Sequence, residues 1–539
     1  MTWATSSGAE VGGTPASAVL PDGGGVPDEG RPVLDAGVVA GLREVLAEGI
    51  LPGVTDTAAS VPKETLAAWV DLLGEVEKVK HTVAAVQARV AVALDEATRA
   101  SEEKQGIRKE RRGRGVPSQV GAAMGQSPNA GAAFLGDARV WVQQMPWTFE
   151  ALRAGALSEW RARIMVRETS HLSAEHRAMI DEQVCGDLRV LAGLGGKRLT
   201  ARIKELASKL DVHACVKRLA KAESERCVSV RPAPDLMVYL TALVPMKQGI
   251  QAYAQLKAHA DALKGTGDER SGGQIMADTL IERVTGRDKA DQVPVTVNLL
   301  VSDETLLAGG SAPGVLLEGS AAGVGAVPAQ VARELVAAGM DADAAWLRAI
   351  YVDPQGRLLA TTSTSRFFPD GIMNLLRARQ QGMCATQYCD APVRHADHVV
   401  PHGQGGPTSL ANGQGLCVRC NHAKQAPGWS QSVLPPDGPE AGGRHAVETV
   451  TPTGHRYLSV MPEPPRPVRD KPVRLDRHPR SDRGSLGCAS APGPIARPRR
   501  GPRRRRAGPH ADLAWGAAQP LTATTHPPWR PQAYPVCRP

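Results

Sequence analysis

Two cysteine pairs constrain the fold of this 539-residue chain more than any other feature. Cys384 and Cys389 are separated by four residues, and Cys417 and Cys420 by two. This spacing is typical of a tetrahedral structural zinc site, whose thiolates hold together a segment too small to bury a core of its own. The sequence therefore predicts a small zinc-stapled module in this part of the chain.

Between the two pairs lie groups suited to chemistry. Asp397 offers a hard oxygen ligand for a divalent metal, and His398 offers a base whose unperturbed pKa is near neutrality. Consecutive side chains on an ideal strand point to opposite faces, so a strand carrying both must end or twist there if both are to reach one phosphate. The glycine-rich run after Pro401 supplies a loop at that point.

The order of these residues, CxxxxC, Asp-His, Gly-Gly, Asn and CxxCN, resembles the HNH (ββα-metal) nucleases. The resemblance implies metal-dependent hydrolysis of nucleic-acid phosphodiesters, with DNA as the expected substrate and RNA left open. It also implies that Asp397 holds the catalytic ion and that His398 activates water. Asn412 falls where the family places the residue that fixes the ring orientation of the base.

The second metal ligand is a choice between Asn421 and His422. Consecutive helical residues point about 100° apart, so only one of them faces an ion bound by Asp397. The family's position directly follows the second cysteine of the CxxC, which selects Asn421. A carboxylate with an amide oxygen favours Mg²⁺ or Mn²⁺ over Zn²⁺ or Ni²⁺. His422 and Lys424 are then expected to contact nucleic-acid phosphate.

One alternative function remains, and two nearby histidines are not assigned to the site. Four cysteines by themselves also fit a zinc-containing nucleic-acid-binding or regulatory protein of a mobile element, without catalysis. His395 and His402 flank the Asp-His pair, but both are expected to lie outside the site.

The larger N-terminal part is expected to be helix-rich with a few strands, which makes the whole chain α+β. Residues 63–103 contain no proline and predict one long amphipathic helix. Its expected apolar stripe consists of Leu66, Trp69, Leu73, Val76, Val83, Val86 and Val90. A basic hinge broken by glycines follows at 103–117. Shorter helices are predicted at 117–123, 129–143, 148–157, 158–169, 173–184, 199–210, 249–263 and 273–284. Most of the first six begin near a Ser, Thr, Asn or Pro suited to an N-cap or a first turn.

Three apolar, β-branched stretches, CVSVRPAP, LMVYLTALVP and VPVTVNLLVSD, predict strands. The two short helices at 117–143 weakly suggest a helix-turn-helix. An ordinary helical hairpin is favoured because the second helix carries no base-reading side chains beyond Asn129 and Arg139.

This large segment resembles the actinobacterial domain of unknown function 222, which precedes HNH modules in the 13E12-repeat family. The stretches that carry the resemblance are ALSEWRARIMVRETSHLS, RPAPDLMVYLTALVP, GDERSGGQIMADTLIERVTG and VPVTVNLLVSD. The resemblance implies an architecture and an association with mobile or multicopy genes. It implies no chemistry for the large domain.

The expected organisation has five parts: a disordered segment at 1–37, the helix-rich domain at 38–353, a connector at 354–380, the HNH module at 381–430, and a Pro/Arg-rich, mostly disordered tail at 431–539. The net charge of +9 is concentrated in that tail. From Met461 onward there are 16 Lys and Arg against 5 Asp and Glu, whereas 48 and 50 precede them. The tail is either a nonspecific phosphate-binding arm or a dispensable solvated extension.

The remaining composition narrows the class of protein. Nine cysteines are too few for a disulfide scaffold, and thiolate ligands favour a reducing compartment. No stretch of 18 apolar residues is present, so no membrane partner is expected. The sequence is interpreted as that of a cytoplasmic protein, and it leaves the oligomeric state open.

Overall fold

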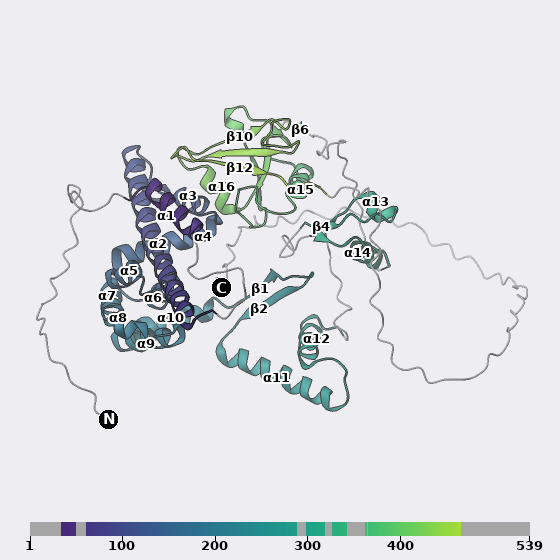
Figure 1. Ribbon diagram of the computed structural model, residues 1–539. Helices are drawn as coiled ribbons and strands as arrows, with labels where there is room; N and C mark the ends of the chain where they lie inside the picture. The colour runs from purple at the N-terminus through teal and green to yellow at the C-terminus, as the bar shows by residue number, and fades with distance from the viewer. Residues whose placement is uncertain are drawn as a thin grey trace, which may run out of the picture. The chain divides into compact units, whose positions relative to one another are not determined.

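The computed structural model describes residues 34–49, 61–287, 298–317, 326–341, 362–363 and 365–464 (Figure 1). The chain divides into two compact units, residues 1–80 and residues 81–539. In the first unit, helix α1 (Ala36–Glu48) begins where the Asp35 carboxylate accepts a hydrogen bond from Val38 N at 2.9 Å. The disorder expected for 1–37 therefore does not apply to its last residues, and the rest of that segment lies outside the described residues.

Helix α2 (Lys63–Lys104) confirms the predicted long helix but buries a different face. Leu66, Leu73 and Val90 of the expected stripe are exposed. From His81 onward, α2 buries the small residues Ala84, Ala85, Ala88 and Ala91 together with Val92. Small side chains allow neighbouring helices to approach closely, so this part of α2 packs through its alanines rather than through its largest apolar residues.

Eight more helices follow α2 in the N-terminal domain. They are α3 (Val116–Ala123), α4 (Pro128–Gln144), α5 (Pro146–Arg153), α6 (Glu159–Thr169), α7 (Ala174–Cys185), α8 (Leu188–Ala192), α9 (Gly196–Leu210) and α10 (Val212–Ser224). The predicted helices are confirmed, although α5 ends earlier than expected, and α8 and α10 were not predicted. Ser127, Ser158 and Ser173 each cap the next helix by accepting a backbone N–H.

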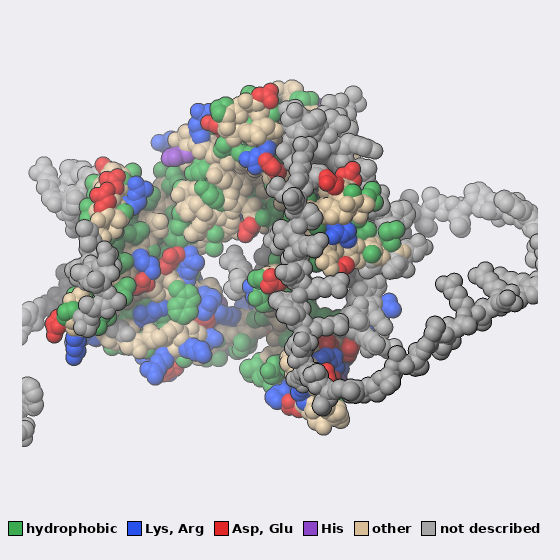
Figure 2. All heavy atoms as spheres, turned by 45° about the vertical axis from the view of Figure 1, so that its right-hand side comes forward, with side chains coloured by type: hydrophobic (Ala, Val, Ile, Leu, Met, Phe, Trp, Pro, Cys, Tyr) green, Lys and Arg blue, Asp and Glu red, His purple; other side chains and the backbone are tan. Residues whose placement is uncertain are grey.

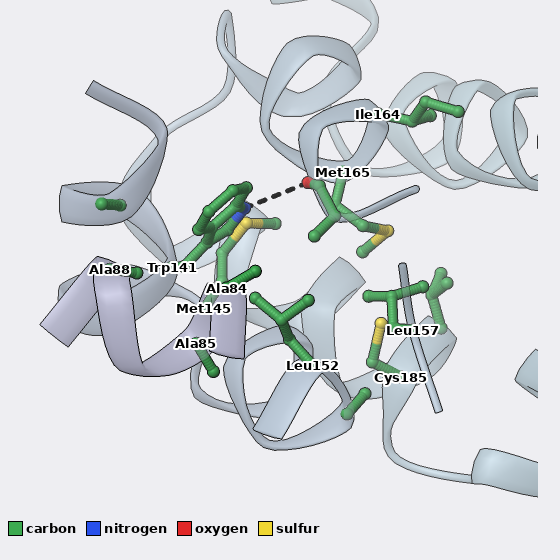
Figure 3. Packing of buried hydrophobic residues seen from close by; sticks show 14 of the residues in the cluster. Ala84, Ala85, Ala88, Trp141, Met145, Leu152, Leu157, Ile164, Met165 and Cys185 are labelled. Carbon is green, nitrogen blue, oxygen red and sulfur yellow. Dashed lines mark hydrogen bonds between the residues drawn. The ribbon is translucent and has the colours of Figure 1, made fainter. Parts of the chain in front are cut away.

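The core of this domain is apolar and aromatic (Figure 3). Trp141 is fully buried, and its indole N–H donates to Ala162 O at 3.1 Å, so the one polar atom of the ring is satisfied. Phe134 meets the same ring edge to face, with centroids 6.2 Å apart. Burial of such large side chains is the main source of stability for a helical domain of this kind.

Helices α3 and α4 form the ordinary hairpin that the sequence favoured. They cross at Gly121 and Gly131, where an added Cβ on either glycine would clash with the backbone of the other helix or its turn. Arg139 of α4 pairs with the buried carboxylate of Asp95 at 2.6 Å, so it is not available to read bases. The helix-turn-helix alternative therefore loses one of its two base-reading candidates.

The next part of the chain is mixed. Strands β1 (Cys227–Pro232) and β2 (Val238–Leu243) form an antiparallel hairpin, followed by α11 (Met246–Gly265) and α12 (Gly272–Thr285). The short elements β3 (Leu299–Leu300), α13 (Asp303–Leu307), β4 (Gly314–Leu316), β5 (Ala326–Val327) and α14 (Ala329–Asp341) come next. The strand predicted at 293–303 is thus confirmed only at β3, and its first five residues lie outside the described residues.

The C-terminal module contains α15 (Asp370–Arg379), the hairpin of β7 (His395–His398) and β9 (Gly413–Leu416), and α16 (Val418–Lys424). A short pair joins β6 (Thr362–Ser363) to β8 (Thr408–Ser409). A meander of β10 (Ser430–Leu434), β11 (Ala446–Val450) and β12 (Arg456–Val460) completes it (Figure 1). The fold class is α+β, as predicted.

The described elements extend beyond the predicted module on both sides. The tail expected from residue 431 begins no earlier than 465, because residues 431–464 contain the paired strands β10 to β12. The connector expected at 354–380 includes α15, whose Ile372 and Leu376 pack with Leu410. The basic arm beyond residue 464 lies outside the described residues.

Candidate active site

The site is built on a strand-strand-helix unit. Strand β7 pairs antiparallel with β9, so that Asp397 lies opposite Gln414 and His398 opposite Gly413. Helix α16 packs against both strands. β7 ends at His398, as the Asp-His geometry required, and the chain then bends at Val399.

The four cysteines converge as predicted. Their sulfur atoms lie within 4.8 Å of one another, and all four residues are buried. Cys389 Sγ and Cys417 Sγ are 3.8 Å apart, which is about the separation that a tetrahedral site with Zn–S bonds of about 2.3 Å requires. The backbone N–H of Cys420 donates to Cys417 Sγ, and the neighbouring Cys384 thiol lowers the pKa of Cys417. The donor set, geometry and burial fit a structural zinc ion.

The Asp397 carboxylate faces α16. Its Oδ2 accepts hydrogen bonds from Lys424 Nζ at 2.6 Å and from Gln414 Nε2 at 3.1 Å. Lys424 also donates to His398 O. Lys424 is nearly buried and directed inward, which differs from its expected contact with a phosphate. Gln414 is in turn bonded to Gln431 Oε1 at 2.6 Å, so the β10–β12 meander supports the carboxylate through one intermediate side chain.

The His398 ring lies among a different set of neighbours. Its Nε2 is 2.8 Å from Thr408 Oγ1, and its ring centroid is 4.4 Å from that of Phe368. His402, which was expected outside the site, places its ring centroid 5.6 Å away. Burial lowers the pKa of His398; the Asp397 carboxylate opposes this shift, and nearby cations such as Lys424 and Arg366 add to it. A lowered pKa keeps the imidazole neutral and able to accept a proton near neutral pH.

Asn412 holds the loop and not the ring. Its Oδ1 accepts from Val400 N at 2.9 Å, and its Nδ2 donates to Val400 O and to Pro407 O, both at 3.0 Å. The contact with the imidazole that the family resemblance implied belongs to Thr408 instead. Asn412 therefore supports the His398 ring only indirectly, by closing the loop that carries Thr408.

Two further residues that the sequence did not indicate hold the loop around Asn412. Arg379 donates to Leu410 O at 2.7 Å and to Gly413 O at 2.6 Å, without a carboxylate partner among the described residues. Burial lowers its pKa to about 9. His445 Nε2 lies 2.8 Å from Ala411 O. These contacts join elements 31 to 34 residues apart in sequence, so no local pattern announces them.

The two neighbouring candidates on α16 differ in their surroundings. Asn421 Oδ1 is buried and has no hydrogen-bond partner, whereas His422 is exposed. Asn421 is three residues before Lys424, so both project from one face of the helix, the face that meets Asp397. His395 is exposed, as expected for a residue outside the site.

Comparisons with known proteins identify two families in this chain. Residues 71–380 match the family described as Domain of unknown function (DUF222), and residues 384–426 match the HNH endonuclease family. No curated protein and no solved structure matches the chain. None of the described helices is both long and apolar enough to cross a membrane. An HNH endonuclease domain supports a nuclease-type function on nucleic acid. Because the first match covers more than half of its length, the chain belongs to the DUF222 family, and an HNH endonuclease domain follows the matched DUF222 region in the sequence.

Proposed function

We propose that this protein is a metal-dependent endonuclease that hydrolyses phosphodiester bonds of DNA at the β7–β9–α16 unit. The observation that carries the proposal is the buried, unpartnered Asn421 Oδ1 on the helix face that meets Asp397. A buried acceptor without a donor is costly. A cation is a partner that would remove this cost.

The donor set fits a hard divalent ion. Asp397 and Asn421 supply a carboxylate and an amide oxygen, which suit Mg²⁺ or Mn²⁺. Lys424 and Gln414 both donate to Asp397 Oδ2, so Oδ1 keeps its lone pairs free of any donor among the described residues. A divalent ion held there would stabilise the charge that develops on the phosphate and the leaving oxygen.

The protein side chains have separate roles in this mechanism. Thr408 binds Nε2 of His398, which fixes the ring and leaves Nδ1 to accept a proton from the attacking water. Phe368 covers one side of the ring and limits its rotation. Lys424 orients the Asp397 carboxylate and offsets its charge within the site. Asn412, Arg379 and His445 hold the backbone that carries Thr408 and β9.

Incubation of the full-length protein with supercoiled plasmid and Mg²⁺ or Mn²⁺ tests the function. We expect nicked or linear product with wild type and none with His398→Ala. Matched zinc content and circular dichroism of the two proteins show that the variant is folded. Plasmid binding without cleavage in every metal would instead favour the non-catalytic, regulatory alternative.

The second ligand is tested by a pair of neighbouring variants. Asn421→Ala should abolish cleavage, a loss on the order of 10²-fold or more, because it removes one of the two proposed protein ligands. His422→Ala should retain most activity, since this side chain is exposed and turned about 100° away. Both should be assayed with Mg²⁺, Mn²⁺, Zn²⁺ and Ni²⁺. The reverse ranking, or a preference for Zn²⁺ or Ni²⁺, would reject this ligand assignment.

A further inference from the structure

The segment between α2 and α3 is strongly basic and carries no assigned role. Residues 104–114, KQGIRKERRGR, contain six Lys and Arg and one Glu. Up to residue 460 the chain as a whole has 48 basic and 50 acidic residues, so this loop is a local concentration of positive charge in an otherwise balanced sequence. On the face drawn in Figure 2, both basic and acidic side chains are present.

The loop is a fixed structure and not the flexible hinge that its glycines suggested. Buried Glu102 accepts a hydrogen bond from Gly113 N at 2.6 Å, which ties the end of the loop to its beginning. Gly113 has a φ of 69° and lies against the Arg99 guanidinium, so a side chain there would be both strained and obstructed. The 3-10 turn Lys109–Arg111 lies between these ends.

Only one of the six cations is neutralised within the loop region. Arg112 pairs with Glu103 at 2.6 Å and donates to Ile107 O at 2.8 Å, so its role is to hold the loop. The other five are exposed and form no ion pair with a described carboxylate. They are Lys104, Arg108, Lys109, Arg111 and Arg114.

The loop leads directly into a contact with the HNH module. Gly115 lies against the indole of Trp429, leaving no space for a Cβ, and Gln119 Nε2 donates to Thr453 Oγ1 at 2.5 Å. Trp429 is five residues beyond the end of α16, and Thr453 joins β11 to β12. Through these contacts a rigid group of unpaired cations is held by the same elements that support the nuclease site.

We infer that the loop 104–114 binds the phosphate backbone of the nucleic acid on which the HNH module acts. Exposed Lys and Arg side chains gain affinity by releasing condensed counterions from phosphates. A loop that is ordered before binding loses little conformational entropy when it binds. The inference rests on the proposed function for its ligand, a nucleic acid, but it concerns a separate surface that takes no part in the hydrolysis.

The test is a titration of a fluorescent DNA duplex, over a series of KCl concentrations and without added divalent metal. The loop variant carries Arg108→Gln, Lys109→Gln, Arg111→Gln and Arg114→Gln. A control variant removes the same charge from exposed positions on α9 and α10. It carries Lys197→Gln, Arg198→Gln, Lys204→Gln and Lys217→Gln.

The slope of log Kobs against log[salt] should fall by about 0.9 for each phosphate that the variant no longer neutralises. We expect the loop variant to lose about 2 to 3.5 units of slope and to bind about 10- to 100-fold more weakly at about 0.1 M KCl. The control should lose less than about one unit. All four loop positions are exposed and unpaired, so both variants should keep wild-type helicity and zinc content.

Equal slopes for the loop variant and wild type would overturn the inference, as would an equal loss in the control. This readout is independent of catalysis. If the wild type never nicks plasmid but the loop variant has a reduced salt slope, the nuclease proposal is refuted and the inference that the loop binds phosphate stands. If the wild type nicks plasmid and the loop variant binds DNA with an unchanged salt slope, the nuclease proposal stands and the loop inference is refuted.

Discussion

The helical domain and the HNH module are stabilised by different physics. The first packs 27 buried apolar residues into one cluster around Trp141, Phe134 and Leu152. In the second, one apolar cluster consists mainly of the four cysteines and the other of three aliphatic side chains. The four cysteines could hold a metal ion. We therefore expect the module to depend on metal binding and on buried polar contacts, whereas the helical domain depends on apolar burial. Removing cysteine ligands should therefore unfold the module alone, and removing a large buried side chain should destabilise the helical domain alone.

The largest effect is expected from the double variant Cys417→Ser, Cys420→Ser. It removes half of the zinc ligands, and structural zinc binding contributes on the order of 10 kcal/mol to small metal-stapled folds. The module should unfold while the helical domain keeps its helicity, as followed by zinc content and limited proteolysis. Cys215→Ser in the helical domain is the control and should retain one zinc per chain. Stoichiometric zinc in the double variant would show that the cysteines are not the ligands.

The opposite variant is Trp141→Ala. Removing this fully buried ring should lower the free energy of unfolding of the helical domain by about 3–5 kcal/mol, because it leaves a cavity and removes the donor to Ala162 O. Chemical denaturation followed by circular dichroism measures the loss. Zinc content should not change. Trp160→Ala, at a ring that is 61% exposed, should cost much less. Equal losses for the two tryptophans would contradict the proposed core.

Arg379→Met tests the polar support of the module. The change leaves the carbonyls of Leu410 and Gly413 without their donors, and we expect a loss of about 2–3 kcal/mol confined to the module. Hydrogen exchange of β9 should rise, whereas exchange in α4 should not. Arg394→Met removes an exposed arginine from the same module and should be nearly neutral. Increased exchange in both elements would mean that the two regions unfold together.

The smallest effect concerns pH. Burial, aided by the charge of Arg379, lowers the pKa of His445 to about 4 from an ordinary value of 6.5. Between these values the unfolded chain binds a proton and the folded module does not, so stability falls as pH falls through this window. His445→Gln should flatten this slope, by on the order of 1 kcal/mol over the window after allowing for the partial exposure of the ring. His422 is exposed, so His422→Gln should leave the slope unchanged. If the unfolding free energy of His445→Gln depends on pH in the same way as that of wild type, His445 is not the cause of the slope.

Local signals in the sequence predicted local features well. The N-cap serines gave the helix starts, and the two cysteine pairs with the Asp-His pair between them gave the centre of the module. The long helix was found, but its buried face was assigned to the larger apolar residues, because hydrophobic periodicity does not reveal that a helix packs through alanines such as Ala84 and Ala88.

Features that depend on long-range contacts were not predicted. The Thr408, Arg379 and His445 contacts join residues that are distant in sequence, and none has a pattern of its own. The β10–β12 meander was missed because its surroundings are rich in proline and glycine. The alternating residues of Ala446–Val450 and Arg456–Val460 did contain a usable strand signal.

The β10–β12 meander bears on how much of the chain must be moved together if the HNH module is transferred to another protein. The family match stops at residue 426, yet Met461 packs with the cysteines and Ser459 accepts a hydrogen bond from Gln387 N at 3.0 Å. Gln431 supports the Asp397 carboxylate through Gln414. A gene fragment cut at the edge of the recognised motif would separate the zinc site from its support. We therefore expect the smallest piece that can be exchanged between chains as a working whole to include Phe368, whose ring lies against that of His398, and to extend through Met461.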